Sequence, residues 1–232
     1  MYGDHVPPVA ERPATVADHL GALFGEAVCR DRQLVIFGIA GADRTTTSKW
    51  CTSIPGAVEA VEELGSRGEV YFGCSLQDPV AALNEARRRA NESGRPEPQD
   101  MQGTRGYARS ACAIGGIWLD VDVEGPGHKA LNLPRTIGAA QELLKALPLR
   151  PTWTVATGGG LHAYWVFKEP WIFEDESERA RAARLVHGWQ VLARGEAQAR
   201  GWTMDSTHDL ARVLRPIGTI NRKYGRRVEV VP

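Results

Sequence analysis

The chain has 232 residues, of which 43% are hydrophobic and 24% charged, a composition typical of a folded globular protein and not of a disordered, fibrous or membrane-spanning one. Lys plus Arg and Asp plus Glu both number 28, so the formal net charge of zero argues against a surface that binds a polyanion all over. Because no apolar run approaches the ~20 residues of a transmembrane helix and the N-terminus lacks the features of a signal peptide, we expect a cytoplasmic protein without a membrane partner.

Capping residues and apolar periodicity predict alternating helices and strands in the first half of the chain. The expected elements are a helix over about 15–29, a strand over 33–39, a helix over 55–64, a strand over 69–73 and a helix over 78–89. Residues 91–109 are rich in Gly, Pro, Gln, Ser and Arg and show no apolar periodicity. This composition predicts a long loop.

The next segment, residues 116–122 (GIWLDVD), is an apolar run that ends in two aspartates. Strand side chains at i and i+2 project from the same face, so Asp120 and Asp122 would lie side by side. Such carboxylates repel unless a cation lies between them, and Mg²⁺ held by a few carboxylates commonly takes substrate phosphates as further ligands. The alternative is an ordinary strand end, because turn-forming residues follow at 124–127 (EGPG).

The second half of the chain predicts an α+β fold. The expected elements are a helix over about 134–147, strands over 152–157 and 161–167 joined by three glycines, a helix over 174–200 and a strand over 228–231. Strands joined as hairpins, with helices between them, indicate a largely antiparallel sheet backed by helices on one face.

A histidine follows the three glycines, in residues 157–165 (TGGGLHAYW). Alternation puts His162 and Tyr164 on one face of the strand, while Leu161, Ala163 and Trp165 point to the other face and form core. A glycine turn lets the backbone approach a ligand closely, so His162 is a candidate site residue. The alternative is a plain hairpin with a half-buried histidine bonded to the backbone.

Residues 204–223 (MDSTHDLARVLRPIGTINRK) hold many carboxylates and cations in one irregular segment. From Arg212 to Arg227 the chain carries six Lys and Arg residues and no acid, so a local basic patch is possible. Arginine forks suit phosphate oxygens, and lysine supplies a mobile point charge. The alternative is a surface loop with internal ion pairs, such as Asp209 with Arg212.

Together, these three segments resemble the primase-polymerases of the archaeo-eukaryotic primase superfamily, and most closely the bifunctional DNA primase/polymerase domains of phages and plasmids. The resemblance covers roughly Val70 to Lys223. It implies an RRM-like antiparallel sheet with the active site on one face and helices on the other, plus an additional N-terminal α/β part. Residues 1–232 would form a single catalytic domain, with parts at about 1–110 and 111–232, cut from a longer protein with helical and helicase regions.

The resemblance also implies the chemistry, which is template-directed joining of NTPs or dNTPs with release of pyrophosphate. Asp120, Asp122 and Asp205 would hold Mg²⁺ or Mn²⁺, with Asp209 as the alternative third ligand, and His162 would be the fourth catalytic residue. The implied nucleotide-binding residues are Thr157, Gly159, Gly160, His162, Arg212, Arg215, Asn221 and Lys223. The partners would be a DNA template and primer, nucleoside triphosphates and a helicase domain of the same protein, in a bacterial or phage-infected cell.

One residue departs from the family pattern, since Gly160 stands where a serine is frequent. Any hydroxyl contact there would have to come from Thr157 or be absent. Two rival functions stay open. A metal-dependent nuclease of the restriction type would need a Glu-x-Lys pair that does not follow Asp122, and a non-catalytic nucleic-acid-binding sheet would present exposed aromatic residues for base stacking.

Overall fold

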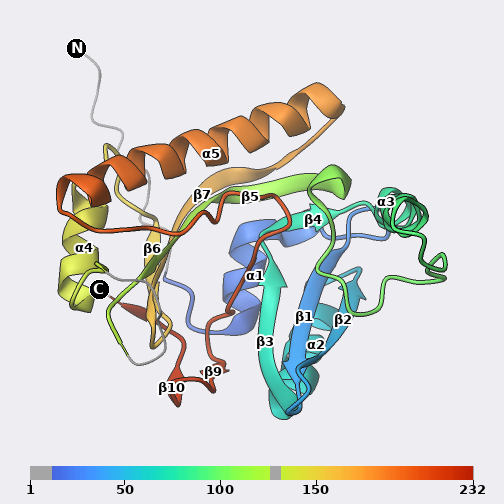
Figure 1. Cartoon of the computed structure of the whole chain (residues 1–232), viewed down its shortest axis with the longest axis horizontal. Helices are drawn as coiled ribbons and strands as arrows, with labels where there is room; N and C mark the ends of the chain where they lie inside the picture. The colour runs from blue at the N-terminus through green and yellow to red at the C-terminus, as the bar shows by residue number, and fades with distance from the viewer. Residues whose placement is uncertain (1–11, 126–131, 232) are drawn as a thin grey trace.

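Two antiparallel sheets lie side by side in the computed structural model, which describes residues 12–125 and 132–231 (Figure 1). The first sheet has four strands in the order β2-β1-β3-β8, and the second has five in the order β11-β6-β7-β5-β4. A short β9-β10 ribbon lies apart from both in the strand pairing. The mixture of helices and antiparallel strands confirms the predicted α+β class.

The N-terminal part contains every element predicted for it and two strands that the sequence pattern did not indicate. Its elements are α1 (Val16–Phe24), β1 (Leu34–Ala40), β2 (Thr45–Cys51), α2 (Ile54–Arg67), β3 (Gly68–Gly73), β4 (Ser75–Gln77) and α3 (Pro79–Glu92). The two missed strands are β2, a largely polar edge strand, and β4, which is three residues long. Neither shows the apolar alternation on which a strand prediction depends.

The first helix shows how local sequence sets the element ends. Thr15 caps α1 as predicted, because its hydroxyl accepts from the Asp18 N–H while the Asp18 carboxylate accepts from the Thr15 N–H. The α-helix ends at Phe24, earlier than expected, because the next residue, Gly25, has a φ of 45° outside the helical range. A 3₁₀ turn over Gly25–Ala27 continues the segment.

The C-terminal part supplies the long strands. Its elements are β5 (Ala111–Asp122), α4 (Ile137–Lys145), β6 (Trp153–Ala156), β7 (Gly160–Ile172), α5 (Glu176–Ala199), β8 (Val213–Leu214), β9 (Ile220–Asn221), β10 (Arg226–Arg227) and β11 (Glu229–Val231). A 3₁₀ turn over Ala108–Ser110 leads from the predicted loop into β5. None of the helices in the described ranges is long and apolar enough to cross a membrane.

The two parts exchange strands. β4, from the N-terminal part, pairs with β5 in the second sheet, and β8, from the C-terminal part, pairs with β3 in the first. The division at about residue 110 stays a prediction, and the exchange means that neither sheet is complete without the other part.

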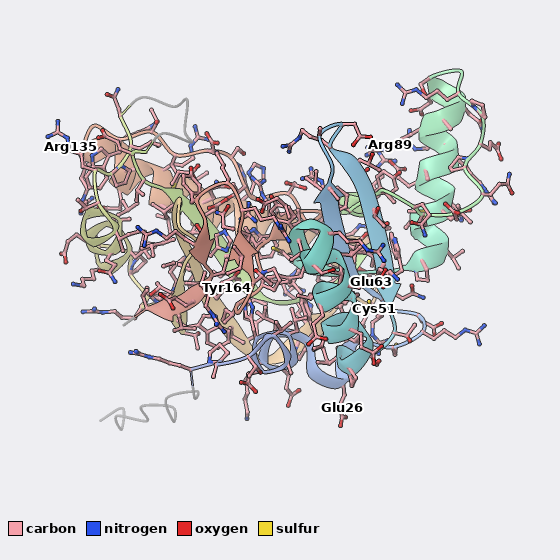
Figure 2. The ribbon with its side chains drawn as sticks, turned by 90° about the horizontal axis from the view of Figure 1, so that it is seen from below. Glu26, Cys51, Glu63, Arg89, Arg135 and Tyr164 are labelled. Atoms are coloured by element: carbon pink, nitrogen blue, oxygen red, sulfur yellow. The ribbon has the colours of Figure 1, made fainter. Side chains whose placement is uncertain are left out.

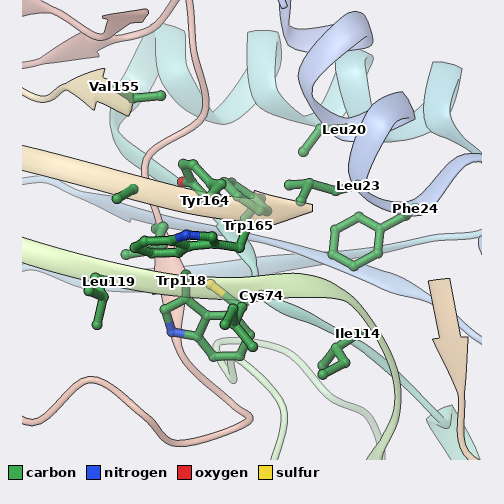
Figure 3. Packing of buried hydrophobic residues seen from close by; sticks show 14 of the residues in the cluster. Leu20, Leu23, Phe24, Cys74, Ile114, Trp118, Leu119, Val155, Tyr164 and Trp165 are labelled. Carbon is green, nitrogen blue, oxygen red and sulfur yellow. The ribbon is translucent and has the colours of Figure 1, made fainter. Parts of the chain in front are cut away.

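The two faces of the second sheet are covered differently. On one face, Trp165 packs edge-on against Trp189 of α5 with ring centroids 4.9 Å apart. On the other face, His19 of α1 packs edge-on against Tyr164, and Figure 3 shows Leu20 and Leu23 of α1 on the helix side of the strand that carries Tyr164. The face that holds Tyr164 and His162 is therefore built into the core by the N-terminal part.

At the centre of that packing lies His19 of α1, which is fully buried. Its ring makes edge contacts with Phe72, Trp153 and Tyr164, and its Nδ1 accepts from the Ile217 N–H at 3.4 Å. Its Nε2 has no hydrogen-bond partner among the described residues. Burial, with a smaller contribution from His162, lowers the pKa of His19 to about 3.

We predict that His19 makes the fold acid-sensitive. Between pH 6.5 and 3 the unfolded chain binds a proton at this residue and the folded chain does not, so the free energy of unfolding falls as the pH is lowered. Replacing His19 with Phe should reduce this slope by up to about 1.4 kcal/mol per pH unit. Urea unfolding of both proteins at several pH values from 7 to 4 measures the slopes, and equal slopes would contradict the prediction.

Candidate active site

The pairing of β5 with β7 brings the two main sequence motifs together. In the antiparallel register Asp120 lies opposite His162, and Asp122 lies opposite Gly160. Asp120 Oδ1 is 3.6 Å from His162 Nε2, an electrostatic contact longer than a good hydrogen bond. The predicted alternation is correct, because the apolar residues that alternate with the aspartates are buried, with Leu119 and Val121 only 0% and 2% exposed.

His162 is more deeply buried than either reading of the sequence expected, with 4% of its surface exposed. The Tyr164 hydroxyl lies 3.4 Å from its Nδ1, so its hydrogen-bond partner is a side chain and not the backbone. Burial and then the positive charges of Arg215 and Arg212 lower the pKa of His162 to about 3. The imidazole is therefore neutral at pH 7 in the protein without ligand.

A pocket of about 240 Å³ opens between the two sheets at this point. Its walls are formed by Tyr71, Asp120, Asp122, Thr157, Gly159, His162, Arg212, Val213, Leu214, Arg215, Asn221, Lys223 and Tyr224. The resemblance names ten residues besides Asp205 and Asp209, and nine of them, all except Gly160, line this pocket. The pocket brings them together from β5, β7, β8, β9 and the turns between them.

Glycines allow the strands to approach each other beside the aspartates. A Cβ at Gly160 would lie 2.2 Å from the Val121 carbonyl oxygen and 2.9 Å from the Asp122 Cα. A side chain therefore does not fit at this position without moving the strand that carries Asp122. A serine at this position would meet the same overlap.

The turn before β7 is held by Asn221. Gly158 has a φ of 86°, and a Cβ there would lie 2.7 Å from the Arg226 Cβ, so the β6-β7 turn packs directly against the β9-β10 ribbon. The Asn221 Nδ2 donates to the Thr157 carbonyl at 2.7 Å, and the Thr157 hydroxyl donates to the Gly160 carbonyl at 3.2 Å. Both side chains thus fix the backbone of the pocket wall.

The cations of the basic segment differ in their surroundings. Arg215 is buried, forms an ion pair with Glu69 and donates to the Tyr71 hydroxyl at 3.0 Å. Arg222 donates to three carbonyl oxygens at the end of α2, those of Gly65, Ser66 and Gly68. Arg222 therefore anchors the segment, whereas Arg212, Arg215 and Lys223 line the pocket.

The two candidate third ligands lie on a segment that passes β5. The Trp118 indole donates to the Thr207 carbonyl at 2.9 Å, and Gln190 of α5 donates to the Asp205 carbonyl. The Asp209 carboxylate lies 3.8 Å from Arg105 and 4.0 Å from Arg212. Neither aspartate lines the pocket, and within the described ranges no three His, Cys, Asp or Glu side chains gather closely enough to hold a metal ion.

Sequence reasoning missed Tyr71 and Tyr224 in the pocket wall and Glu69 behind it. Glu69 and Tyr71 share one face of β3 by strand alternation, which the sequence does indicate. Their relation to Arg215 depends on the pairing of β3 with the two-residue strand β8, and no local pattern signals that pairing.

This architecture is similar to that of two solved structures. The AEP domain of the cyanophage S-2L primase-polymerase superposes with a TM-score of 0.51 at 16% identity, covering 87% of this chain and 81% of that one. The chain shares the primase-polymerase fold. Primase RepB′ matches with a TM-score of 0.47 at 14% identity over 94% of this chain, which spans about half of that protein, 56%. No protein-family model and no curated protein matches the sequence.

We predict that this primase-polymerase fold does not accept a side chain at Gly160. Gly160→Ser and Gly160→Ala should each lower the free energy of unfolding by about 1–3 kcal/mol, because the added Cβ overlaps the β5 backbone. The control is Gly195→Ala on α5, where an added Cβ meets nothing within 4 Å. This substitution should raise the free energy of unfolding by about 0.5–1 kcal/mol, because Ala favours a helix over Gly. Urea unfolding measures all three, and a Gly160→Ser protein as stable as wild type would overturn this reading.

Proposed function

We propose that the chain catalyses template-directed nucleotidyl transfer, as a DNA primase/polymerase that joins NTPs or dNTPs and releases pyrophosphate. The observation that carries the proposal is the arrangement of charge in the pocket. Asp120 and Asp122 on β5 form the acidic wall of the pocket beside His162, and Arg212 and Arg215, on either side of β8, form its basic wall together with Lys223. A polyphosphate could bind both walls, because it would contact a metal ion held by the aspartates and the Arg and Lys side chains at the same time.

The donor set fits a hard divalent cation that is shared with substrate. Mg²⁺ is usually held by one or two carboxylates plus substrate phosphates and water, so two adjacent aspartates suffice to begin such a site. We propose Asp120 and Asp122 as ligands of Mg²⁺ or Mn²⁺. Asp205 does not line the pocket in this structure, so as the proposed third ligand it would have to approach the pair when the metal binds. When bound, the metal would polarise the phosphoryl group and stabilise charge on the attacking and leaving oxygens.

The chain's own residues would bind and orient the triphosphate. Arg212, Arg215 and Lys223 would offset the charge that builds up on the leaving pyrophosphate. Because His162 is neutral in the pocket, it would act as a hydrogen-bond donor to a phosphate oxygen before it could act as an acid. The β6-β7 turn, with Thr157 and Gly159 in the pocket wall, would bring backbone close to the nucleotide.

The site face does not suit a binding module that stacks bases. Trp118 and Tyr164 share the face of Asp120 and His162, and they are only 3% and 2% exposed. Base stacking on a sheet needs exposed rings. A nuclease would use the same carboxylates for hydrolysis, so the products of the reaction decide between these two enzymes.

We predict that the double variant Asp120→Asn plus Asp122→Asn loses nucleotide incorporation by at least about 10³-fold, because metal stabilisation of the transition state is worth several kcal/mol. The assay supplies labelled nucleotides with a primed and an unprimed template, in Mg²⁺ and in Mn²⁺. DNA affinity and the unfolding midpoint should stay close to wild type, since Asn keeps the size of Asp.

Other outcomes of this assay would remove the proposal. Extension by the double variant at the wild-type rate would rule out the carboxylates as metal ligands. Shortened DNA without incorporated label, lost in the same variant, would identify a nuclease. DNA binding with neither product in the wild type would leave a binding module.

We further predict that nucleotide incorporation depends more on Asp205 than on Asp209. Two guanidinium groups already flank the Asp209 carboxylate, which disfavours its use as a ligand of a third cation. Asp205→Asn should reduce incorporation at least about 100-fold, and Asp209→Asn less than about tenfold. The same extension assay, with metal concentration varied, measures both, and the reverse order would assign the third ligand to Asp209.

A further inference from the structure

Arg215, in the basic wall of the pocket, is held by two residues of β3 in the first sheet. Its guanidinium forms an ion pair with Glu69 and donates through Nη2 to the Tyr71 hydroxyl at 3.0 Å. Its Cζ also lies 4.7 Å from the centroid of the Tyr71 ring. Arg215 is only 9% exposed, so these contacts fix the orientation of a nearly buried cation.

Strand pairing explains how these residues meet. Glu69 and Tyr71 project from the same face of β3, and β3 pairs with β8 through Phe72 opposite Leu214. Arg215 directly follows β8 and so comes to lie beside Tyr71. Glu69 also accepts from the Lys223 N–H at 3.1 Å, which ties a second cationic residue of the wall to the same carboxylate.

A guanidinium presents five N–H donors in a rigid fork, and only the direction of that fork decides whether two of them reach one phosphate. Glu69 and Tyr71 each engage a different terminal nitrogen, so together they set the plane of the fork. Burial raises the pKa of Tyr71, so its hydroxyl stays protonated and neutral in the working pH range.

We propose that Tyr71 is a positioning residue, which aims the Arg215 fork at the polyphosphate of the incoming nucleotide. The inference rests on the proposed function for the identity of the ligand. It assigns to the N-terminal sheet a part in substrate binding, in addition to its part in packing. Tyr71 is a better probe than Glu69, because replacing Glu69 would change the charge of the pocket as well as its geometry.

The test measures binding of inorganic tripolyphosphate with Mg²⁺ to the whole chain by isothermal titration calorimetry. Tyr71→Phe should weaken binding about three- to tenfold, since a hydrogen bond to a charged group is worth about tenfold or more and only part of it reaches the ligand through Arg215. Binding by the variant within twofold of wild type, or no binding by the wild type, would overturn the inference.

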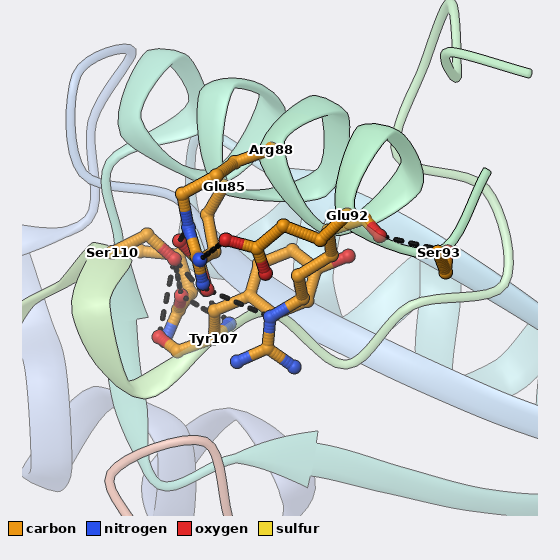
Figure 4. Close-up of polar contacts among 8 residues, drawn as sticks. Glu85, Arg88, Glu92, Ser93, Tyr107 and Ser110 are labelled. Atoms are coloured by element: carbon orange, nitrogen blue, oxygen red, sulfur yellow. Dashed lines mark hydrogen bonds and ion pairs between the residues drawn. The ribbon is translucent and has the colours of Figure 1, made fainter. Parts of the chain in front are cut away.

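The chain offers a matched control in Tyr107. The Arg89 Cζ lies 4.6 Å from the Tyr107 ring centroid, nearly the same geometry as at Tyr71, but Tyr107 belongs to the α3 side of the molecule (Figure 4). Figure 2 shows Arg89 beside α3, toward the right of the view, and Tyr164 to the left of the centre. Tyr107→Phe should leave the affinity for tripolyphosphate unchanged.

A double-mutant cycle separates positioning from a merely structural role. If Tyr71 acts through the fork, Tyr71→Phe should weaken binding in wild type but add less than twofold in an Arg215→Lys background, where no fork remains. An equal loss in both backgrounds would show that Tyr71 only supports the fold and would overturn the inference.

This experiment is independent of catalysis. If the cycle gives the expected coupling but the chain never incorporates nucleotides on a primed template, the proposed function fails and the positioning of Arg215 for a polyphosphate holds. If incorporation is found but the cycle shows no coupling, the proposed function holds and the role of Tyr71 fails.

Discussion

The register of β5 against β7 is the constraint on which the site depends. Side chains alternate along a strand, so a slip of one residue would turn Asp120 and Asp122 into the core and Leu119 toward the pocket. Close backbone contacts resist such a slip. A Cβ at Gly116 would lie 2.4 Å from the Trp165 carbonyl oxygen, as one at Gly160 would lie 2.2 Å from that of Val121. Glycines at both ends of the regular stretch from Gly116 to Asp122 therefore help to specify this register.

The second requirement is contact between the two sheets. The acidic wall belongs to β5 of the second sheet, whereas Arg215 and Tyr71 stand where β8 pairs with β3 of the first. Arg222 strengthens this junction, because its donors satisfy carbonyl groups at the C-terminus of α2, where the helix dipole favours a cation. The pocket is thus a product of the strand exchange, and neither part would form it alone.

The sequence predicted what is local and periodic. The helix starts near residues 15 and 78, the long helices and the faces of β5 and β7 all follow from spacing, because their side chains respond to neighbours a few residues away. The short strands β8 and β9 and the contact between Tyr71 and Arg215 could not be predicted in this way. The Tyr71–Arg215 contact and the pairing of β8 with β3 join segments at least 140 residues apart, so the free energy that orders them comes from tertiary pairing.

Two cations of the pocket, Arg215 and Arg212, already lie beside carboxylates. Six cations without an acid from Arg212 to Arg227 suggested an open patch, but a buried cation is stable only with a partner. Glu69 supplies one for Arg215 from 146 residues away, and Asp209 lies beside Arg212. The pocket is therefore nearly balanced in charge before a ligand enters. Under the proposed function this balance suits a nucleotide that arrives with its metal, because the metal offsets much of the triphosphate charge. Such a site must orient its ligands and donors more than it must provide net positive charge. The strand register orients Asp120 and Asp122, and the contacts to Glu69 and Tyr71 orient Arg215.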